Sequence, residues 1–576
     1  ELLGEFITRI AQGDAGSRLT PALVFCFNRD ECWSIAEQLK GCSLLSEPGR
    51  SQLLDEVNRL DWSQGAGPKL KQLLMRGVGV HHAGLLPKYR RVVESLFQRK
   101  LLAVAICTET LAAGINLPAR SVVLTSLVKG PPGEQKLIDA SSAHQIFGRA
   151  GRPQFDDRGY VFALAHEDDV KILRWKQKYD AIPEDTKDLG LLKAKKALKK
   201  KRPTRRENQT YWNEQQFEKL KLAPPGKLYS KGPLPWRLLA YLLTISPEVE
   251  PIRKLIRKRL MDEPRIRAGE QALDRMLLTL WAGGYVSLEP PPPPKSEASG
   301  PAQVEKSAAF AGPPAVTGGR GLLGLPTHAG PAAAPPVAPP RYSPTLAKPT
   351  ETLPRLLPFR SVNPLYGAFL IEQLGIADST ERLQALESVL GLPGPVLRYV
   401  RPPRDLAPGP LAMTRLDGEL IRRGLMAAPL EADDDEDRDE REPPERPPSL
   451  AEKLRLLFDS LYPGVGEFET QSVWVAGELF FFGGNFNNYV KTRDLTKQEG
   501  LIFRHLLRLI LLCEEFAALT PPEVSPDDWQ AELRELSQRL AASCREVDPA
   551  STEELIAQAH AADVVEGEES AAPRSL

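Results

Sequence analysis

The chain has 576 residues, of which 42% are hydrophobic, and its 75 basic and 75 acidic residues sum to a formal net charge of zero. This length predicts three or four domains of about 150 residues each. The balanced charge excludes a molecule-wide field that attracts nucleic acid, so electrostatic binding depends on local clusters.

The six cysteines and seven histidines show neither the spacing of a disulfide framework nor that of a metal site. No stretch reaches about 18 uninterrupted apolar residues, the length that a membrane-spanning helix needs. We therefore expect a cytoplasmic protein with no metal site of its own and no membrane contact. The chain begins at Glu1, without an initiator Met or a signal peptide, and we expect it to be a fragment.

Short apolar runs alternate with helical patterns over residues 1–180. The predicted strands cover residues 22–27, 78–80, 101–107, 121–125 and 160–165. Predicted helices begin after Asn28, whose spacing to Glu31 is that of a capping box, and near Pro87 and Ala140. Strands that alternate with helices predict an α/β fold with a parallel sheet covered on both faces. In such sheets ligands bind outside the carboxyl ends of the strands.

Two segments, residues 108–119 and 145–152, follow predicted strands or helices at this edge of the sheet. In the second segment Arg149 and Arg152 stand three residues apart on a turn that contains glycines. Two guanidinium groups suit a polyphosphate because each donates paired hydrogen bonds to phosphate oxygens. A surface arginine pair that answers Asp156 and Asp157 explains the same pattern equally well.

Four segments in register resemble motifs IV, IVa, V and VI of superfamily-two helicases. They are the region of Asn28, the run HHAGLLP from His81, the run TETLAAGINLPA from Thr108 and the run QIFGRAGRP from Gln145. Their wording is similar to that of the Ski-type DExH-box branch, which includes exosome-associated RNA helicases. The resemblance implies that residues 1–180 form the second of two RecA-like domains, between which such enzymes hydrolyse ATP with Mg²⁺.

The resemblance also implies roles for individual residues. Arg149 and Arg152 are implied as arginine fingers for the γ-phosphate, with Gln145 on the nucleotide side. The residues implied to face ATP are Gly114, Asn116 and Gly148. The residues implied to hold the nucleic-acid strand are Asn28, His82, Gly84, Thr108, Glu109 and Thr110. For His81 and His82, packing in the core beside Gly84 is an equal alternative.

The chain departs from the helicase pattern in one respect. It contains no Gly-x-x-x-x-Gly-Lys-Ser/Thr phosphate loop, since Gly226-Lys227 is followed by Leu228, and no Asp-Glu-x-His/Asp after an apolar strand. We therefore expect ATP and Mg²⁺ to be bound mainly by a first RecA-like domain that this chain lacks. The chain alone is expected to hydrolyse no ATP.

Residues 181–229 are predicted to form a basic connector. The run from Leu192 to Arg206 holds nine basic residues and no acid: Lys193, Lys195, Lys196, Lys199, Lys200, Lys201, Arg202, Arg205 and Arg206. Each phosphate that such a run neutralises adds roughly 0.7 to 0.9 to the salt dependence of binding. We predict contact with nucleic acid, centred on Lys199 and Lys200; a solvated linker is the alternative.

Three apolar stripes at helical spacing and a short strand follow over residues 230–290. Three helices closed by a strand resemble the winged-helix domain of Ski-type enzymes, for which bracing the RecA-like pair is the expected role. Residues 291–355, rich in Pro, Ala and Gly, are predicted to be a disordered linker. A protein partner that reads polyproline is an alternative use of this linker.

The remainder is predicted to be mainly α-helical. Residues 356–430 form a small helical unit, residues 431–449 an acidic spacer, and residues 450–576 a carboxyl-terminal helical domain. The preferred interpretation of the whole is the carboxyl-terminal half of an ATP-dependent RNA helicase. The alternatives are a DNA helicase of the same superfamily and a non-catalytic nucleic-acid-binding scaffold with a degenerate RecA-like fold.

Overall fold

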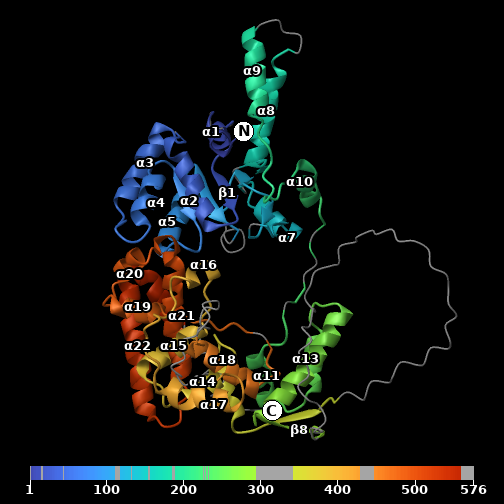
Figure 1. The fold of residues 1–576 in the computed structure, drawn as a ribbon, viewed down its shortest axis with the longest axis vertical. Helices are drawn as coiled ribbons and strands as arrows, with labels where there is room; N and C mark the ends of the chain where they lie inside the picture. Colours follow the sequence, from blue (N-terminus) through green and yellow to red (C-terminus); the bar gives the residue numbers. More distant parts are fainter. Residues whose placement is uncertain are drawn as a thin grey trace, which may run out of the picture. The chain divides into compact units, whose positions relative to one another are not determined.

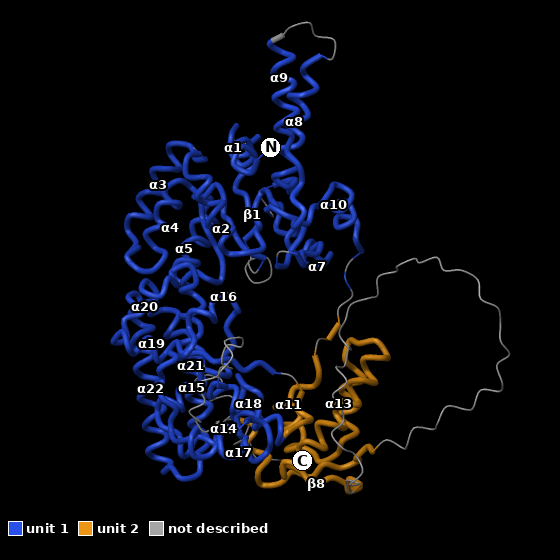
Figure 2. Tube along the Cα trace, viewed as in Figure 1, with its two compact units in different colours: residues 1–228, 358–461, 467–576 blue, residues 229–357, 462–466 orange. Residues whose placement is uncertain are grey.

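A computed structural model describes the chain except for residues 1, 14–16, 43, 110–116, 132, 153–155, 184–188, 225, 227–228, 231, 294–341, 428–446, 467 and 559–576. The chain forms two compact units (Figure 2). The first unit comprises residues 1–228, 358–461 and 467–576, and the second comprises residues 229–357 and 462–466. Within the first unit, residues 2–228 are called the sheet domain and residues 358–558 the helical domain.

The sheet domain contains a five-stranded parallel sheet with the strand order β2-β3-β1-β4-β7 (Figure 1). Its strands are β1 (Ala22–Cys26), β2 (Val78–His81), β3 (Val104–Thr108), β4 (Ser121–Leu124) and β7 (Tyr160–Ala163). The first four strands are buried almost throughout. Continuous apolar runs are typical of parallel strands that are covered on both faces. All five predicted strands are confirmed, with β3 starting three residues later than predicted.

Helices pack on this sheet. They are α1 (Leu3–Ala11), α2 (Arg29–Gln38), α3 (Glu47–Asn58), α4 (Gly67–Leu74), α5 (Pro87–Gln98) and α7 (Ala140–Phe147). The Asn28 side chain caps α2 by accepting from the Glu31 amide at 2.7 Å. The predicted capping box is only half formed, because the Glu31 carboxylate accepts from the Thr125 hydroxyl at 2.9 Å instead. A minor hairpin joins β5 (Val128–Lys129) to β6 (Lys136–Leu137).

The predicted basic connector is largely helical. Helices α8 (Glu167–Asp180) and α9 (Leu189–Lys200) lie side by side, and α10 (Glu214–Lys221) packs on α7 (Figure 1). The Trp175 indole of α8 donates to the Leu198 carbonyl of α9 at 2.8 Å, and its ring stacks on Tyr179. The indole hydrogen bond joins the two helices. Five basic residues of the run therefore stand on helix α9, whereas the last four follow it: Lys201, Arg202, Arg205 and Arg206.

The second unit contains the three predicted helices and a two-stranded sheet. Its elements are α11 (Trp236–Ile245), α12 (Glu250–Arg257), α13 (Glu263–Ala282), β8 (Val286–Glu289), β9 (Leu346–Pro349) and the 3₁₀ helix η2 (Leu353–Leu356). Strand β9 pairs with β8 in antiparallel register. The predicted boundary at residue 290 is therefore wrong, because the second strand lies inside the predicted linker. Residues 294–341 of that linker lie outside the described residues.

The helical domain packs residues from both sides of the predicted acidic spacer into one core. Its helices are α14 (Pro364–Gln373), α15 (Ser379–Ser388), α16 (Gly394–Leu397), the π-helical η3 (Leu411–Leu416), α17 (Asp417–Arg422), α18 (Leu450–Leu461), α19 (Val475–Phe481), α20 (Phe486–Thr492), α21 (Glu499–Ala517) and α22 (Pro526–Val547). Tyr366 contacts Phe458 and Phe468, with ring centroids 5.0 and 4.9 Å apart. The spacer thus does not separate two cores, and most of it lies outside the described residues.

Two buried glutamates of α15 hold this core together. Glu387, fully buried, accepts from the amides of Val475 and Ala476 at 2.9 and 2.8 Å, and its carboxylate lies 3.0 Å from Nε2 of His505. Glu381 accepts from two amides at the start of η3 at 2.8 Å each. A carboxylate at a helix start satisfies amides that lack an intrahelical partner, so each glutamate fixes a distant helix to α15.

Among the described residues, no helix is long and apolar enough to cross a membrane. The same part of the chain contains no group of three or more His, Cys, Asp or Glu side chains that could hold a metal ion. All six cysteines are free thiols.

We expect Glu387→Ala to destabilise the helical domain by about 3 kcal/mol, because two buried amides and His505 lose their acceptor. Urea unfolding followed by tryptophan fluorescence measures the change. Glu535→Ala, an exposed position on α22, is the control and is expected to change stability by less than about 0.5 kcal/mol. Equal stability of the two variants would contradict this role of Glu387.

Candidate functional site

The end of the first segment and the second segment are joined at the amino edge of the sheet, because Ala119 and Gly159 directly precede β4 and β7. The expectation that residues 145–152 lie at the carboxyl edge is therefore wrong, and only the start of the first segment, at Thr108, lies there. Ala119 donates its amide to the Arg149 carbonyl at 2.9 Å and accepts from the Gly151 amide at 2.7 Å. Gly151 has φ of +90°, and a Cβ on Gly159 would overlap the backbone of Ala150. Glycine is required here because the two loops approach each other closely. The structure thus brings the end of the first segment against the arginine-bearing turn.

Arg152 has an internal partner. Its Nε and Nη2 donate to the two oxygens of Asp156 at 2.6 and 2.7 Å, and its amide donates to the same carboxylate at 3.0 Å. The side chains are 13% and 4% exposed. The hydrogen bonds from Arg152 hold the pKa of Asp156 below its usual value. Arg152 therefore pairs with Asp156, as the alternative to phosphate binding predicts, and its guanidinium group fixes the turn.

The other predicted nucleotide residues differ in position. Gln145 is exposed on α7, Gly148 is the C-cap of this helix, and Arg149 follows as a half-buried residue. Gly114 and Asn116 lie outside the described residues. Gln145 thus lies on the last turn of α7 and Arg149 just after its end. Contact of either residue with a nucleotide stays a prediction.

The predicted nucleic-acid residues after β1 and β3 lie on neighbouring strands. Cys26, two residues before Asn28, pairs in register with Thr108. The Glu109 carboxylate is paired with Lys129, whose Nζ donates to it at 3.1 and 3.2 Å. Thr110 lies outside the described residues. Asn28 and Thr108 thus meet at one edge of the sheet, as the sequence predicts.

His82 is a core residue. It is fully buried, its Nδ1 accepts from the Gly84 amide at 3.0 Å, and its ring meets Trp33 edge to face with centroids 5.9 Å apart. Burial, reinforced by the charge of Arg29, lowers the pKa of His82 to about 3. The burial of His82 agrees with the alternative of core packing, and contact of His82 with nucleic acid stays a prediction.

Gly84 contacts the helical domain. Its carbonyl accepts from the Gly500 amide of α21 at 2.8 Å. A Cβ on Gly84 would lie 2.5 Å from the Lys497 carbonyl, and a Cβ on Gly500 would overlap the Leu85 carbonyl. The chain itself therefore covers Gly84, and its predicted contact with nucleic acid is not available in this structure.

Arg29, Arg90 and Arg504 come together where α21 meets the sheet domain, and Arg508 stands one turn further along α21, where it lines a pocket of the helical domain. The sequence patterns did not predict this group. We call Arg29 of α2, Arg90 of α5, and Arg504 and Arg508 of α21 the arginine cluster. The pKa values of Arg29, Arg90 and Arg508 are lowered. Desolvation is the larger cause and repulsion from Arg504 the second. The Nε of Arg90 is buried and has no hydrogen-bond partner among the described residues.

Acidic residues act against this repulsion, Asp30 on Arg29 and Glu94 and Asp548 on Arg90. Burial is the largest cause that lowers both pKa values, so these guanidinium groups are partly desolvated. A group of partly desolvated like charges is unfavourable until an anion binds between them. Two or more guanidinium groups are suited to phosphate. The cluster therefore has the chemistry of a site for a phosphate backbone.

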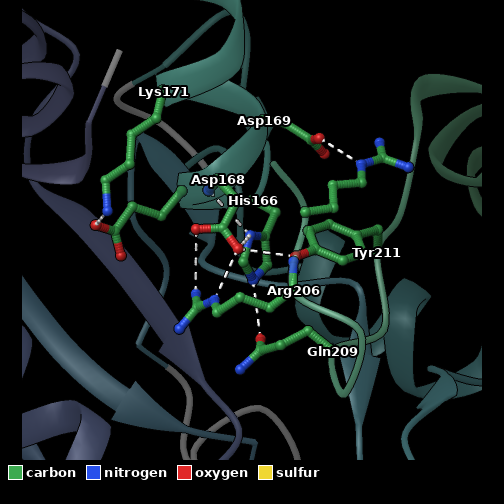
Figure 3. A network of polar contacts seen from close by, with 9 residues as sticks. His166, Asp168, Asp169, Lys171, Arg206, Gln209 and Tyr211 are labelled. Atoms are coloured by element: carbon green, nitrogen blue, oxygen red, sulfur yellow. Dashed lines mark hydrogen bonds and ion pairs between the residues drawn. The ribbon is translucent and has the colours of Figure 1, made fainter. Parts of the chain in front are cut away.

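The basic run of the connector divides into paired and exposed residues. Arg206 donates to Asp168 at 2.8 Å, Tyr211 donates to the same carboxylate at 2.8 Å, and Arg205 donates to Asp169 at 2.7 Å (Figure 3). These arginines fasten the chain after α9 to the start of α8. Lys199 and Lys200 are exposed on α9 and remain candidates for nucleic-acid contact.

A separate cavity of about 530 Å³ lies in the second unit between α12 and α13. It is lined by three arginines, two of which form close ion pairs: Arg253 with Asp274 at 2.6 Å and Arg257 with Glu270 at 2.6 Å. Because acids in its wall neutralise these arginines, the cavity offers no excess charge to an anion.

We expect Arg152→Ala to destabilise the sheet domain by about 2 kcal/mol, because the nearly buried Asp156 carboxylate loses its partner. Thermal unfolding followed by circular dichroism measures the change. Arg158→Ala, an exposed position on the same loop, is the control. A loss no larger than that of the control would show that the Arg152–Asp156 pair does not fix the turn.

Comparison with known proteins identifies this domain. Residues 56–154 match the model of the helicase conserved C-terminal domain. A chloroplastic DExH-box ATP-dependent RNA helicase of Arabidopsis thaliana, DExH15, is 37% identical over 148 residues, which are 25% of this chain and 13% of the relative. The ATP-dependent RNA helicase mtr4 of Schizosaccharomyces pombe is 36% identical over 154 residues, 26% of this chain and 14% of the relative.

The antiviral helicase SKI2 of Saccharomyces cerevisiae is 32% identical over 172 residues, which are 29% of this chain and 13% of that protein. The matched part thus spans about one seventh of these relatives. The parallel sheet, the joined loops and these matches agree on one assignment. The sheet domain is thus similar to the C-terminal helicase domain of Ski-type superfamily-two helicases.

Proposed function

We propose that the protein acts as an ATP-dependent RNA helicase, in which the sheet domain is the second RecA-like domain. Relatives similar to this chain bear the name of ATP-dependent RNA helicase. The single observation that supports binding of a nucleic-acid strand is the arginine cluster, because it brings partly desolvated guanidinium groups of α2, α5 and α21 together. The proposed reaction is ATP hydrolysis coupled to movement along a single strand.

The strand is proposed to pass along the carboxyl edge of the sheet. Asn28 and Thr108 lie at this edge on adjacent strands, and Arg29 follows Asn28 directly. Their polar groups contact phosphates, which fix the position of the strand without reading its bases. Arg504 and Arg508 of α21 hold the phosphates from the other side. Lys199 and Lys200 offer a further, sequence-independent contact.

ATP and Mg²⁺ are proposed to bind mainly to a first RecA-like domain, since the 576 residues contain no phosphate loop. Mg²⁺ and the arginines together neutralise the charge that develops on the γ-phosphate. Gln145, on the last turn of α7, and Arg149, just after its end, are this chain's candidates for that role, with Gly114, Asn116 and Gly148 lining the cleft. Arg152 supports Arg149 by fixing the turn through Asp156.

The second unit is proposed to be a winged helix that braces the helicase. Its support is the succession of three helices and an antiparallel pair, in which β9 supplies the strand that the sequence analysis missed. A cytoplasmic location and a partner for the Pro-rich linker remain predictions from the sequence.

We expect Arg504→Ala to weaken binding of a single-stranded RNA and to lower its salt dependence, the slope of log K against log[salt], by about 0.7. Fluorescence anisotropy of a labelled oligouridylate at several salt concentrations measures both quantities. Arg534→Ala, an exposed arginine on α22, is the control. An unchanged slope in Arg504→Ala would contradict the proposed strand contact, and competition by unlabelled DNA of equal length separates an RNA helicase from a DNA helicase.

The 576-residue chain alone is expected to show no steady ATP turnover, with or without RNA, because it lacks the residues that hold the phosphates and Mg²⁺. A coupled assay for released phosphate measures this. Steady turnover that Arg149→Ala abolishes would contradict the prediction and would place a complete nucleotide site within this chain.

A further inference from the structure

Glu499, the first residue of α21, inserts its side chain into the sheet domain. The residue is fully buried, although it is a carboxylate. Its Oε2 accepts from the Ala66 amide at 3.2 Å, and a second backbone hydrogen bond comes from Leu86, at the start of α5. Its Oε1 has no partner among the described residues. Buried carboxyl groups are rare unless neighbouring groups require them, so this placement needs a physical reason.

The socket for Glu499 is shaped around one glycine. Gly65 has φ of +48°, and a Cβ at this position would overlap the Glu499 carboxyl group. The same turn is held by other parts of the helical domain: the Gly65 amide donates to the Asn487 side chain at 3.0 Å, and the Gln64 side chain donates to the Glu546 carbonyl at 3.0 Å. The turn is therefore built to receive the Glu499 side chain.

A second contact fixes the same end of α21. Gly500 donates its amide to Gly84, and neither glycine leaves room for a side chain. The preceding residue, Gln498, accepts from Nη1 of Arg29 at 2.8 Å. The plug at Glu499 and the backbone contact at Gly500 lie on successive residues, so together they limit both sliding and rotation of α21 against the sheet domain.

The arginine cluster depends on this end of α21. Arg504 follows Glu499 by about one and a half turns and Arg508 by about two and a half turns of an α-helix. A small shift or rotation of the first turn would move Arg504 away from Arg29 and Arg90, and Arg508 would move with it. The charges that meet across the two domains are therefore aligned by the residues that dock α21.

We propose that Glu499 is a positioning residue, whose carboxyl group plugs the socket of Gly65, Ala66 and Leu86 and thereby aligns Arg504 and Arg508 with Arg29 and Arg90 on one phosphate strand. The proposal rests on the proposed function, because only a bound strand makes this alignment useful. Glu499 itself touches neither the strand nor ATP.

The plug takes up a proton on docking. Desolvation raises the pKa of Glu499 from an ordinary 4.5 to about 8. The charged and titratable groups that face it are Lys88 and Tyr89 of α5, with Asp61 and Asp548 acting on Lys88. Because the docked pKa is raised, docking is most favourable below about pH 4.5 and loses this contribution as the pH rises through about 8. A glutamine, which resembles the protonated carboxyl group, removes the dependence.

The test compares the 576-residue chain with its Glu499→Gln and Glu499→Ala variants, and with Glu535→Gln on α22 as the matched control. Hydrogen exchange of the Ala66 and Leu86 amides, corrected for intrinsic rates, reports docking at pH 6.5 and 8.5. Anisotropy with a single-stranded RNA reports alignment. We expect the protection of the two amides in the wild type to fall on the order of tenfold between these pH values. In Glu499→Gln the protection is expected to be independent of pH, and in Glu499→Ala it is expected to be lost. RNA affinity is expected to fall about tenfold only in Glu499→Ala.

A second pair of variants guards against simple misfolding. Gly65→Ala introduces a clash with Glu499, whereas Gly424→Ala introduces a methyl group at a similar φ of +69° with no atom within 4 Å. We expect Gly65→Ala to reduce protection and RNA affinity, Gly424→Ala to change neither, and Gly65→Ala combined with Glu499→Ala to cost less than the sum of the single changes.

Three outcomes overturn the proposal. Protection that survives in Glu499→Ala excludes the plug. Loss of protection without loss of RNA affinity, in a chain where Arg504→Ala does weaken binding, excludes the positioning role. RNA affinity that is unchanged even in Arg504→Ala excludes the proposed function on which the role rests. This third outcome can be told from the first, because hydrogen exchange still shows in it whether α21 is docked.

Discussion

A buried carboxyl group requires hydrogen-bond donors around it. Three buried glutamates use such donors to hold distant parts of this chain in place. Glu381 and Glu387 accept from amides that begin η3 and α19, and Glu499 accepts from Ala66 between the two domains of the first unit. Burying an unsatisfied carboxyl group is costly, so each of these side chains specifies one arrangement of the segments that it joins. The relation between the sheet domain and α21, on which the arginine cluster depends, follows from the last of the three.

The zero net charge of the chain conceals a marked local imbalance. Arg152, Arg205 and Arg206 form salt bridges with Asp156, Asp169 and Asp168, respectively. In the arginine cluster, by contrast, burial and the charge of Arg504 lower the pKa values of Arg29, Arg90 and Arg508. A site that is electrostatically unfavourable in the free protein gains most when phosphate enters it. We therefore place the proposed strand contact at the arginine cluster, whose guanidinium groups are not neutralised by direct salt bridges among the described residues. The number of basic residues in a run does not predict this place.

Local patterns predicted the fold better than they predicted the site. The strands and most helices follow from apolar periodicity, and Asn28 caps α2 as its position indicates. The partner of Glu31 and the second strand β9 were missed because each depends on residues far away in the sequence, and local sequence left the burial of His82 as one of two equal alternatives. The arginine cluster was missed for the same reason, although Arg504 and Arg508, one turn apart in an otherwise apolar helix, were a readable signal of a polar stripe on α21.

The arginine cluster brings like charges together, and in the proposed function a phosphate strand offsets them. Thermal stability and RNA affinity, measured on the same Arg504→Ala chain, separate a role of Arg504 in binding from a role in folding. Removing one of four like charges is predicted to leave the free protein as stable as the wild type or more stable, while RNA affinity falls. A variant that loses stability and keeps its RNA affinity would contradict the account, because Arg504 would then serve the fold rather than the strand.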